Sequence, residues 1–147
     1  TKVANSLSTY LITHREKTMS ELKKVLYIED EPDIRAVAEI ALQQIGGLVL
    51  KCCASGPEGL ESISDFDPQL ILLDVMMPGM DGPTVLAHIR ENTDYQHIPV
   101  VFITAKVQAA EVEDLMKLGA FAVISKPFSP MEIAGQLRDI WKDFCRA

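Results

Sequence analysis

Five short runs of apolar, mostly branched residues recur from residue 25 onward, each beginning roughly twenty to thirty residues after the one before. Short runs of this composition between turn-forming residues are typical of β-strands. Several of them show no polar alternation, as expected when helices cover both faces of a sheet. The predicted strands are "VLYI" (25–28), "LVLKCC" (48–53), "LILL" (70–73), "VVFI" (100–103) and "FAVI" (121–124).

The segments between these runs place apolar residues at helical spacing. From Ile34 to Ile45 the apolar residues share one helical face, and Gly46 and Gly47 end the pattern. Strands that alternate with helices imply βαβ crossovers and a parallel sheet. We therefore predict a doubly wound α/β domain with five parallel strands and a helix in each gap. Besides 34–45, helices are expected over 83–91, over 107–118 (ended by Gly119) and over 131–144.

The first 22 residues are expected to form an N-terminal extension, with the α/β domain over 23–147. Residues 1–18 lack the basic start and unbroken apolar core of a signal peptide. Val3, Leu7, Tyr10 and Leu11 fall at helical spacing, so both a loosely ordered extension and a short amphipathic helix agree with this segment.

The composition limits the class of function. Hydrophobic residues make up 48% of the 147 residues and charged residues 24%, which is typical of one globular domain. The formal net charge of -7 argues against a surface that binds nucleic acid directly, and no apolar run reaches the length of a membrane span. Cys52, Cys53 and Cys145 have neither a disulfide nor a metal-ligand spacing. Reduced cysteines are typical of a cytoplasmic protein, which is the location we expect.

Polar residues that can do chemistry follow four of the five predicted strands. Glu29 and Asp30 follow the first strand, Asp74 the third, Thr104 the fourth, and Lys126 closely follows the fifth. In doubly wound sheets, ligands bind at the carboxyl ends of the strands. Clustered carboxylates repel each other and need a cation, and oxygen ligands suit Mg²⁺. A carboxylate nucleophile, a divalent metal, an ammonium and a hydroxyl together indicate phosphoryl transfer to aspartate.

Taken one at a time, these residues also have structural explanations. The acids before Pro32 could cap the first helix, and Thr104 could be a helix N-cap. Lys126 and Pro127 could form an ordinary turn, and residues 81–83 are expected to start the third helix. These explanations leave the coincidence at one sheet edge unaccounted for.

Two other functions use part of this chemistry. A metal-dependent phosphatase with an aspartyl nucleophile usually has a second acid two residues later, where this chain has Met76. A flavin- or nucleotide-binding module would need a Gly/Ser/Thr-rich loop after the first strand, and "EDEPDIR" at that place would repel phosphate. Neither function fits these residues well.

Four stretches resemble the receiver domain of bacterial two-component response regulators. They are "YIEDEPDIR", "LILLDVMMPGMDG", "VVFITAK" and "AVISKPF", and the resemblance runs from about Lys23 to Arg146. Each stretch alone is a weak signal, but all four in order at the expected strand ends are specific. The resemblance implies a flavodoxin-like (βα)5 fold with strand order 2-1-3-4-5. It also suggests a chemotaxis-regulator-like, stand-alone receiver or a fragment of a longer protein.

The resemblance implies roles for the acidic residues. Asp74 would accept a phosphoryl group from a sensor histidine kinase or a histidine phosphotransfer protein. Asp30, Asp74 and the main-chain carbonyl of Met76 would bind Mg²⁺. Glu29 stands at the family's first acidic position, which is more often Asp, so direct and water-mediated metal binding both stay open.

The resemblance also implies a switch rather than a turnover enzyme. Thr104 and Lys126 would each contact a phosphoryl oxygen, and the bond between Lys126 and Pro127 would be cis. A downstream protein would bind the 106–145 face. Val123 occupies the place of the family's usual switch aromatic, so we expect signalling to depend on the loop after Thr104 and on the helix that follows it.

Overall fold

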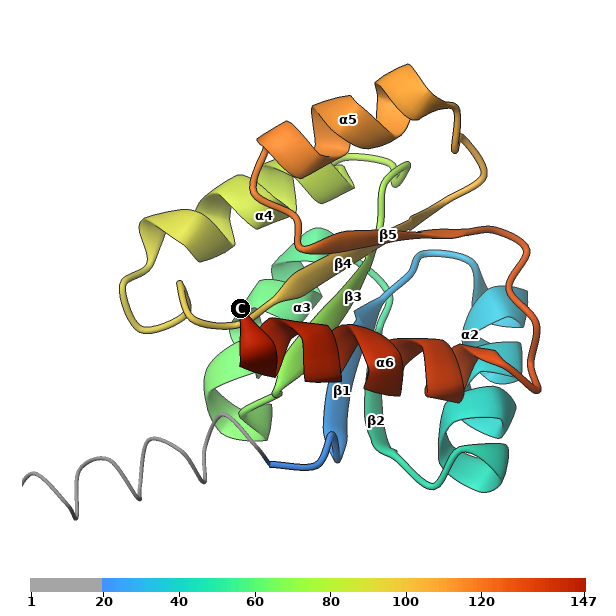
Figure 1. Ribbon diagram of the computed structural model, residues 1–147. Coiled ribbons are helices and arrows are strands. Elements are labelled where there is room, and N and C mark those ends of the chain that lie inside the picture. The colour runs from blue at the N-terminus through green and yellow to red at the C-terminus, as the bar shows by residue number, and fades with distance from the viewer. Residues whose placement is uncertain (1–19) are drawn as a thin grey trace, which may run out of the picture.

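The five predicted strands form a single parallel sheet in the computed structural model, which describes residues 20–147 (Figure 1). Each observed strand begins and ends within one residue of its predicted run. The strands pair in the order β2-β1-β3-β4-β5, which confirms the flavodoxin-like, doubly wound fold. Their bounds are β1 (Lys24–Ile28), β2 (Val49–Cys53), β3 (Leu70–Asp74), β4 (Val100–Thr104) and β5 (Ala122–Ser125).

A helical segment follows every strand, as the alternating pattern predicts. The predicted helices over 83–91, 107–118 and 131–144 correspond to α4, α5 and α6, although α5 and α6 each begin two residues later than expected. The bounds are α2 (Pro32–Ala38), η1 (Glu39–Ile45), α3 (Gly56–Phe66), α4 (Gly82–Glu91), α5 (Ala109–Lys117) and α6 (Ile133–Arg146).

The first predicted helix differs from expectation in its second half. Beyond Ala38 the helix continues as the π-helix η1, whose wider turns are closed by bonds such as that from the Gly46 amide to the Ala41 carbonyl, 3.0 Å long. The π-helix has wider turns than an α-helix, but η1 spans only seven residues, too few for the hydrophobic pattern to separate the two.

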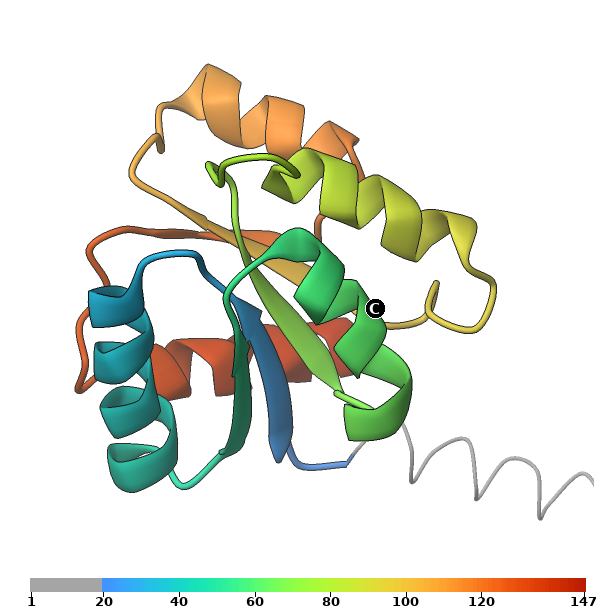
Figure 2. The same cartoon turned by 180° about the vertical axis from the view of Figure 1, so that it is seen from behind.

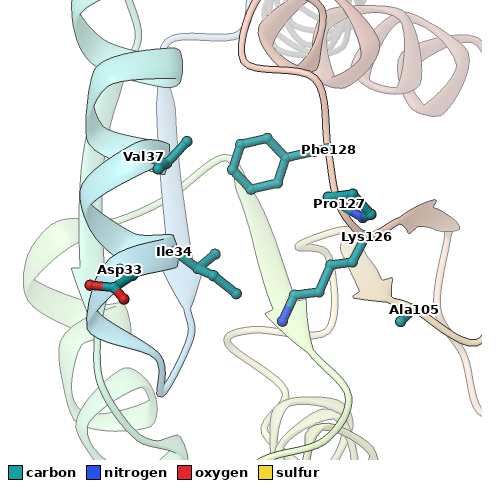
Figure 3. A pocket seen from close by; sticks show the side chains of 7 residues that line it. All are labelled: Asp33, Ile34, Val37, Ala105, Lys126, Pro127 and Phe128. Carbon is teal, nitrogen blue, oxygen red and sulfur yellow. The ribbon is translucent and has the colours of Figure 1, made fainter.

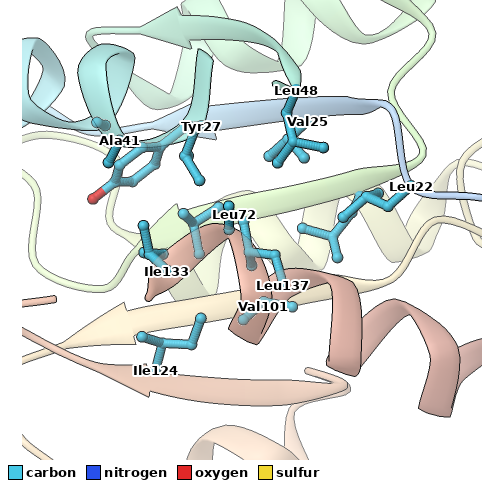
Figure 4. Packing of buried hydrophobic residues seen from close by; sticks show 14 of the residues in the cluster. Leu22, Val25, Tyr27, Ala41, Leu48, Leu72, Val101, Ile124, Ile133 and Leu137 are labelled. Atoms are coloured by element: carbon cyan, nitrogen blue, oxygen red, sulfur yellow. The ribbon is translucent and has the colours of Figure 1, made fainter. Parts of the chain in front are cut away.

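Helices cover both faces of the sheet and create two cores. One core lies under α2, η1 and α6, and the other lies under α3, α4 and α5 (Figures 1 and 2). Along β1, Tyr27 points into the first core and Ile28 into the second. Figure 4 shows the first core, where Tyr27 and Leu72 of the sheet face Ile133 and Leu137 of α6. Burial on both faces explains why these strands show no polar alternation.

The segment before β1 joins the first core at its start. Leu22 is buried there, and the indole N–H of Trp141 on α6 donates to the Ser20 carbonyl at 2.6 Å. The expectations for residues 1–18 lie outside the described residues. In the part of the chain that the structure describes, no helix is both long and apolar enough to cross a membrane.

Candidate functional site

The carboxyl ends of the parallel strands bring a lysine and two acids into direct contact. The Lys126 ammonium lies 2.6 Å from Glu29 Oε1 and 3.1 Å from Asp74 Oδ1. Glu29 follows β1, Asp74 ends β3 and Lys126 follows β5, so only the parallel topology brings them together. The Lys126 amide also donates to the Thr104 carbonyl at 2.9 Å, which ties the loop after β5 to the end of β4.

Glu29 is fully buried, and both of its carboxylate oxygens accept hydrogen bonds. Oε1 accepts from Lys126 and from the Tyr27 hydroxyl at 3.1 Å, and Oε2 accepts from the Glu31 amide at 3.2 Å. Burial acts to raise the pKa of Glu29, but the bonds from Lys126 and from the Glu31 amide outweigh it, so this pKa lies below its usual value. Glu29 is therefore a carboxylate that three hydrogen-bond donors hold in its ionised form.

Asp30 has a buried carboxylate oxygen, Oδ1, with no hydrogen-bond partner among residues 20–147. One carboxylate oxygen from each of Glu29, Asp30 and Asp74 lies within 4.8 Å of the others. A buried oxygen without a donor is costly, and a cation is the partner that such a cluster accepts. The all-oxygen donor set fits Mg²⁺, as the sequence predicts.

Asp74 ends a strand in which all five residues are buried. Burial raises the pKa of Asp74 to about 7, Lys126 opposes that rise, and the charge on Glu29 adds to it. Near neutral pH this carboxyl is thus poised between its protonated and ionised forms. Nearby positive charge shifts the balance toward the ionised, nucleophilic form.

Lys126 precedes a cis peptide bond to Pro127, which confirms that prediction. Burial acts to lower the pKa of Lys126, but its hydrogen bonds to Glu29 and Asp74 outweigh burial, so this pKa lies above its usual value. The side chain also lines a pocket of about 370 Å³ between α2 and the loop after β5. Figure 3 shows Ile34 and Val37 of α2 facing Phe128 across this pocket.

Thr104 and Met76 lie at the same edge of the sheet. Thr104 is buried one position beyond Ile103, the register partner of Asp74, and its hydroxyl accepts from the Lys106 amide at 3.1 Å. Met76 follows Asp74 by two residues, and its side chain is 64% exposed.

The structural explanations of these residues can now be compared with the structure. Thr104 is not a helix N-cap, because α5 begins at Ala109 with Gln108 as its N-cap. Glu31 is the N-cap residue of α2, but its side chain makes no capping hydrogen bond. Asp81 does start the third helix, α4, as expected, since its carboxylate accepts from the Thr84 amide at 2.9 Å.

Sequence reasoning assigned no role to Tyr27 or Arg35, which also contact this site. The Tyr27 phenol bonds Glu29, and one guanidinium nitrogen of Arg35 donates to the carbonyls of Glu29 and Asp30. A signal existed for Tyr27, because residues i and i+2 of a strand lie on the same face. For Arg35 the signal was weaker, since residue type and spacing do not show that a long side chain reaches back to the main chain.

Comparison with known proteins decides the family. Residues 25–138 match the family model of the response regulator receiver domain. The chain belongs to this family. Membership places this receiver domain in two-component signalling, where receivers are phosphorylated on an aspartate, typically use Mg²⁺ and generally act as switches.

Two curated relatives and one solved structure illustrate the likeness. Response regulator Rre1 of Synechocystis sp. is 31% identical over 122 residues, covering 83% of this chain and 53% of that protein. The probable transcriptional regulator ycf27 of Cyanophora paradoxa is 37% identical over 118 residues, covering 80% and 48%. The Vibrio cholerae chemotaxis protein CheY4 has a TM-score of 0.75 at 26% identity, covering 81% of this chain and 98% of that one. This receiver domain thus spans about half the length of the curated relatives it matches.

Proposed function

We propose that Asp74 accepts a phosphoryl group from a phosphohistidine of a sensor kinase or phosphotransfer protein, with Mg²⁺ bound beside it. The observation that carries this proposal is the buried Asp74 carboxylate, which lies among Glu29, Asp30 and Lys126 at the carboxyl edge of the sheet. The proposed receiver unit is residues 23–147.

In the proposed transfer, a carboxylate oxygen of Asp74 forms the new bond to phosphorus. The bond between phosphorus and the histidine nitrogen breaks, and the imidazole leaves with its electron pair. Lys126, 3.1 Å from Asp74 before transfer, then donates to one phosphoryl oxygen, and the Thr104 hydroxyl donates to another. When bound, Mg²⁺ supplies positive charge that offsets the charge of the phosphoryl oxygens.

The proposed metal ligands are Asp30, Asp74 and the main-chain carbonyl of Met76. Asp30 is the strongest of these candidates, because its buried Oδ1 lacks any other partner among residues 20–147. Glu29 already accepts bonds from three donors, so we assign it a water-mediated contact to the metal and the task of holding Lys126.

The proposed output is a change in the surface formed by residues 106–145, which a downstream protein reads. Lys106, Glu111 and Lys117 are candidate contacts on it. The domain would act as a switch that takes part in its own phosphorylation and slow dephosphorylation.

Intact mass after incubation with acetyl phosphate tests this function. The wild-type chain should gain one phosphoryl group with Mg²⁺ and none when the metal is chelated. Asp74→Asn should gain none, whereas Asp139→Asn, at an exposed aspartate of α6, should behave like the wild type. Equal modification of Asp74→Asn and the wild type would show that Asp74 is not the acceptor. Asp30→Asn should need more Mg²⁺ for the same rate, because it removes an anionic ligand.

A further inference from the structure

Arg35 makes an unusual contact with the segment that carries the first two acids. It lies in the last turn of the short helix α2, and its partly buried guanidinium reaches back along the chain. The single nitrogen Nη1 donates to the Glu29 carbonyl at 2.8 Å and to the Asp30 carbonyl at 2.9 Å. One side chain therefore fixes two consecutive peptide units at the end of β1.

The acids around Arg35 do not bond to its guanidinium. Four of the five residues from Glu29 to Asp33 are acidic, yet none of the ion pairs among residues 20–147 involves Arg35. A guanidinium is well suited to bind carboxylates in a bidentate manner, so bonding to main-chain carbonyls instead is informative. It leaves the Asp30 carboxylate without a bond from Arg35, consistent with Oδ1 having no hydrogen-bond partner among residues 20–147.

We propose that Arg35 is a positioning residue of the magnesium site: it holds the peptide units of Glu29 and Asp30 so that the Asp30 carboxylate faces Asp74 before the metal arrives. This inference rests on the magnesium site proposed above. The like charges of this segment repel one another, and Arg35 holds their main chain without occupying a ligand oxygen. Groups that orient metal ligands in this way usually alter metal affinity by tenfold or more when removed.

The direction of the change in Mg²⁺ affinity distinguishes a positioning role of Arg35 from an effect of its charge alone. A cation beside a magnesium site repels the metal, so removing the charge of Arg35 alone would tighten Mg²⁺ binding. Losing the two hydrogen bonds would loosen it, because the Asp30 carboxylate would no longer be held in place. Weaker binding in Arg35→Gln therefore identifies positioning.

The test is calorimetric titration of Mg²⁺ into wild type, Arg35→Gln, Arg35→Lys and a matched control, Arg90→Gln. Arg90 also binds main-chain carbonyls, those of Ile98 at 3.0 Å and Gly119 at 3.1 Å, but these precede β4 and β5, at the opposite edge of the sheet from Asp30. We expect Arg35→Gln to weaken Mg²⁺ binding about tenfold. Its rate of phosphorylation by acetyl phosphate should approach the wild-type rate at saturating Mg²⁺, because every ligand is still present.

Arg35→Lys should recover part of the affinity, since an ammonium can also donate to two carbonyls from one nitrogen. Arg90→Gln should bind Mg²⁺ like the wild type even if it unfolds more easily. Unchanged or tighter binding in Arg35→Gln, or equal weakening in Arg90→Gln, would overturn the inference. If Arg35→Gln does not fold, Arg35→Lys must bind more weakly than the wild type, and equal binding would overturn it. A wild-type chain that binds no Mg²⁺ would instead refute the proposed magnesium site.

Discussion

Glu29 shows how one methylene group changes a site. Receivers more often carry Asp at this position, and the longer Glu side chain here reaches both Lys126 and the Tyr27 phenol. A buried tyrosine hydroxyl needs a partner, and burial together with the charge on Glu29 raises the pKa of this phenol. Tyr27 therefore stays a neutral hydrogen-bond donor to Glu29. Glu29 is bonded to Tyr27 and Lys126, whereas Asp30 Oδ1 has no hydrogen-bond partner among residues 20–147.

Met76 and Lys106 are expected to control how long the phosphoryl group lasts. Both side chains are exposed, two residues after Asp74 and Thr104, where water would approach the phosphoryl group. Met76 cannot orient an attacking water, because a thioether is a poor hydrogen-bonding group. We predict slow self-dephosphorylation in the wild type and a several-fold faster loss in Met76→Asn. Phosphate release after removal of acetyl phosphate measures both rates, and equal rates would count against this role for Met76.

We predict that the Cys52 thiol makes the free energy of unfolding fall at alkaline pH. Burial raises its pKa from 9.0 to about 12, and Glu39 adds to the rise. Below pH 9 the thiol is protonated in both states. Between pH 9 and 12 the unfolded chain has lost a proton that the folded chain keeps, so the free energy of unfolding falls as pH rises. Urea unfolding at pH 8 and at pH 10.5 should show this fall.

A smaller fall is expected in Cys52→Ala, because the titrating thiol is gone. Cys145→Ala is the matched control, since burial alone raises the pKa of that thiol and no acid adds to it. Cys145→Ala should reduce the fall in the free energy of unfolding by less than Cys52→Ala does. An identical pH dependence in Cys52→Ala and the wild type would refute this assignment.

At the scale of elements, the start of α4 supports the end of β3. A Cβ added at Gly82 would lie 2.4 Å from the Asp74 carbonyl and 3.0 Å from the Phe102 ring. The Gly82 amide also donates to the Val75 carbonyl at 2.9 Å. Only glycine lets the helix approach the strand this closely, so Gly82 belongs to the packing that holds Asp74 in place.

Gly82→Ala should lower the free energy of unfolding by roughly 1–3 kcal/mol, because main-chain atoms must move apart. It should also slow phosphorylation by acetyl phosphate, since Asp74 is displaced. Gly135→Ala is the control: no atom of the described chain lies within 4 Å of an added Cβ there. Within a helix that change should stabilise the fold by about 0.5–1 kcal/mol. Urea unfolding compares the two, and equal effects would contradict the packing argument.

An element boundary can be read from the sequence where a local signal exists, as at Asp81, which was expected to start α4 and is its N-cap. The start of α3 carries a similar signal, although we predicted no bounds for that helix. The Ser55 hydroxyl accepts from the Glu58 amide at 3.3 Å, and the Glu58 carboxylate accepts from the Ala54 amide at 2.8 Å. These two residues form a capping motif at the start of α3, and their types and spacing can be recognised in the sequence. The change from the α-helix α2 to the π-helix η1 has no such local signal in the sequence, because it depends on how the helix packs. Gly46 lies so close to Ala134 of α6 that an added Cβ would be 2.6 Å from the Ala134 Cβ.

Across the whole molecule, topology explains why the site could be predicted. Parallel strands place Glu29, Asp74, Thr104 and Lys126 at one edge, so knowing the strand ends was enough to gather them. The bonds among them were not predictable in the same way. Which oxygen of Glu29 takes Lys126, and where Arg35 reaches, depend on rotamers and packing that residue type does not encode.

We expect phosphorylation of Asp74 to change the surface formed by residues 106–145. Strand β5 has no aromatic side chain that could transmit this change. Val123 has no ring, and it packs on the core under α5. The sequence pattern places Phe121 on the same strand face, but its ring packs edge-on against Phe144 of α6, with centroids 5.3 Å apart. Phe121 lies before β5 begins, so strand alternation does not govern its direction. It therefore cannot take over the inward swing of the family's usual aromatic.

The loop after Thr104 and the helix α5 are the elements best able to move. Residues 105–110 are all exposed, and Leu115 is the one buried residue of α5. Segments with few buried contacts open at the lowest free energy. At its far end, α5 is followed by Gly119, whose carbonyl is held by Arg90. We therefore predict that phosphorylation shifts 104–118, most at the Thr104 end and least near Gly119.

The predicted shift of residues 104–118 follows from the hydrogen bonds that Thr104 makes with and without a phosphoryl group on Asp74. The Thr104 hydroxyl accepts from the Lys106 amide and can also donate its proton, so a Thr104 that moves to donate to a phosphoryl oxygen on Asp74 would draw the Lys106 amide with it. Two states differ only as far as their contacts differ, so the loop that Thr104 leads must carry the change. Backbone chemical shifts with and without beryllofluoride, a phosphoryl mimic, measure it. Asp74→Asn should show no change, and a wild-type 104–118 segment unaltered by the mimic would refute this mechanism.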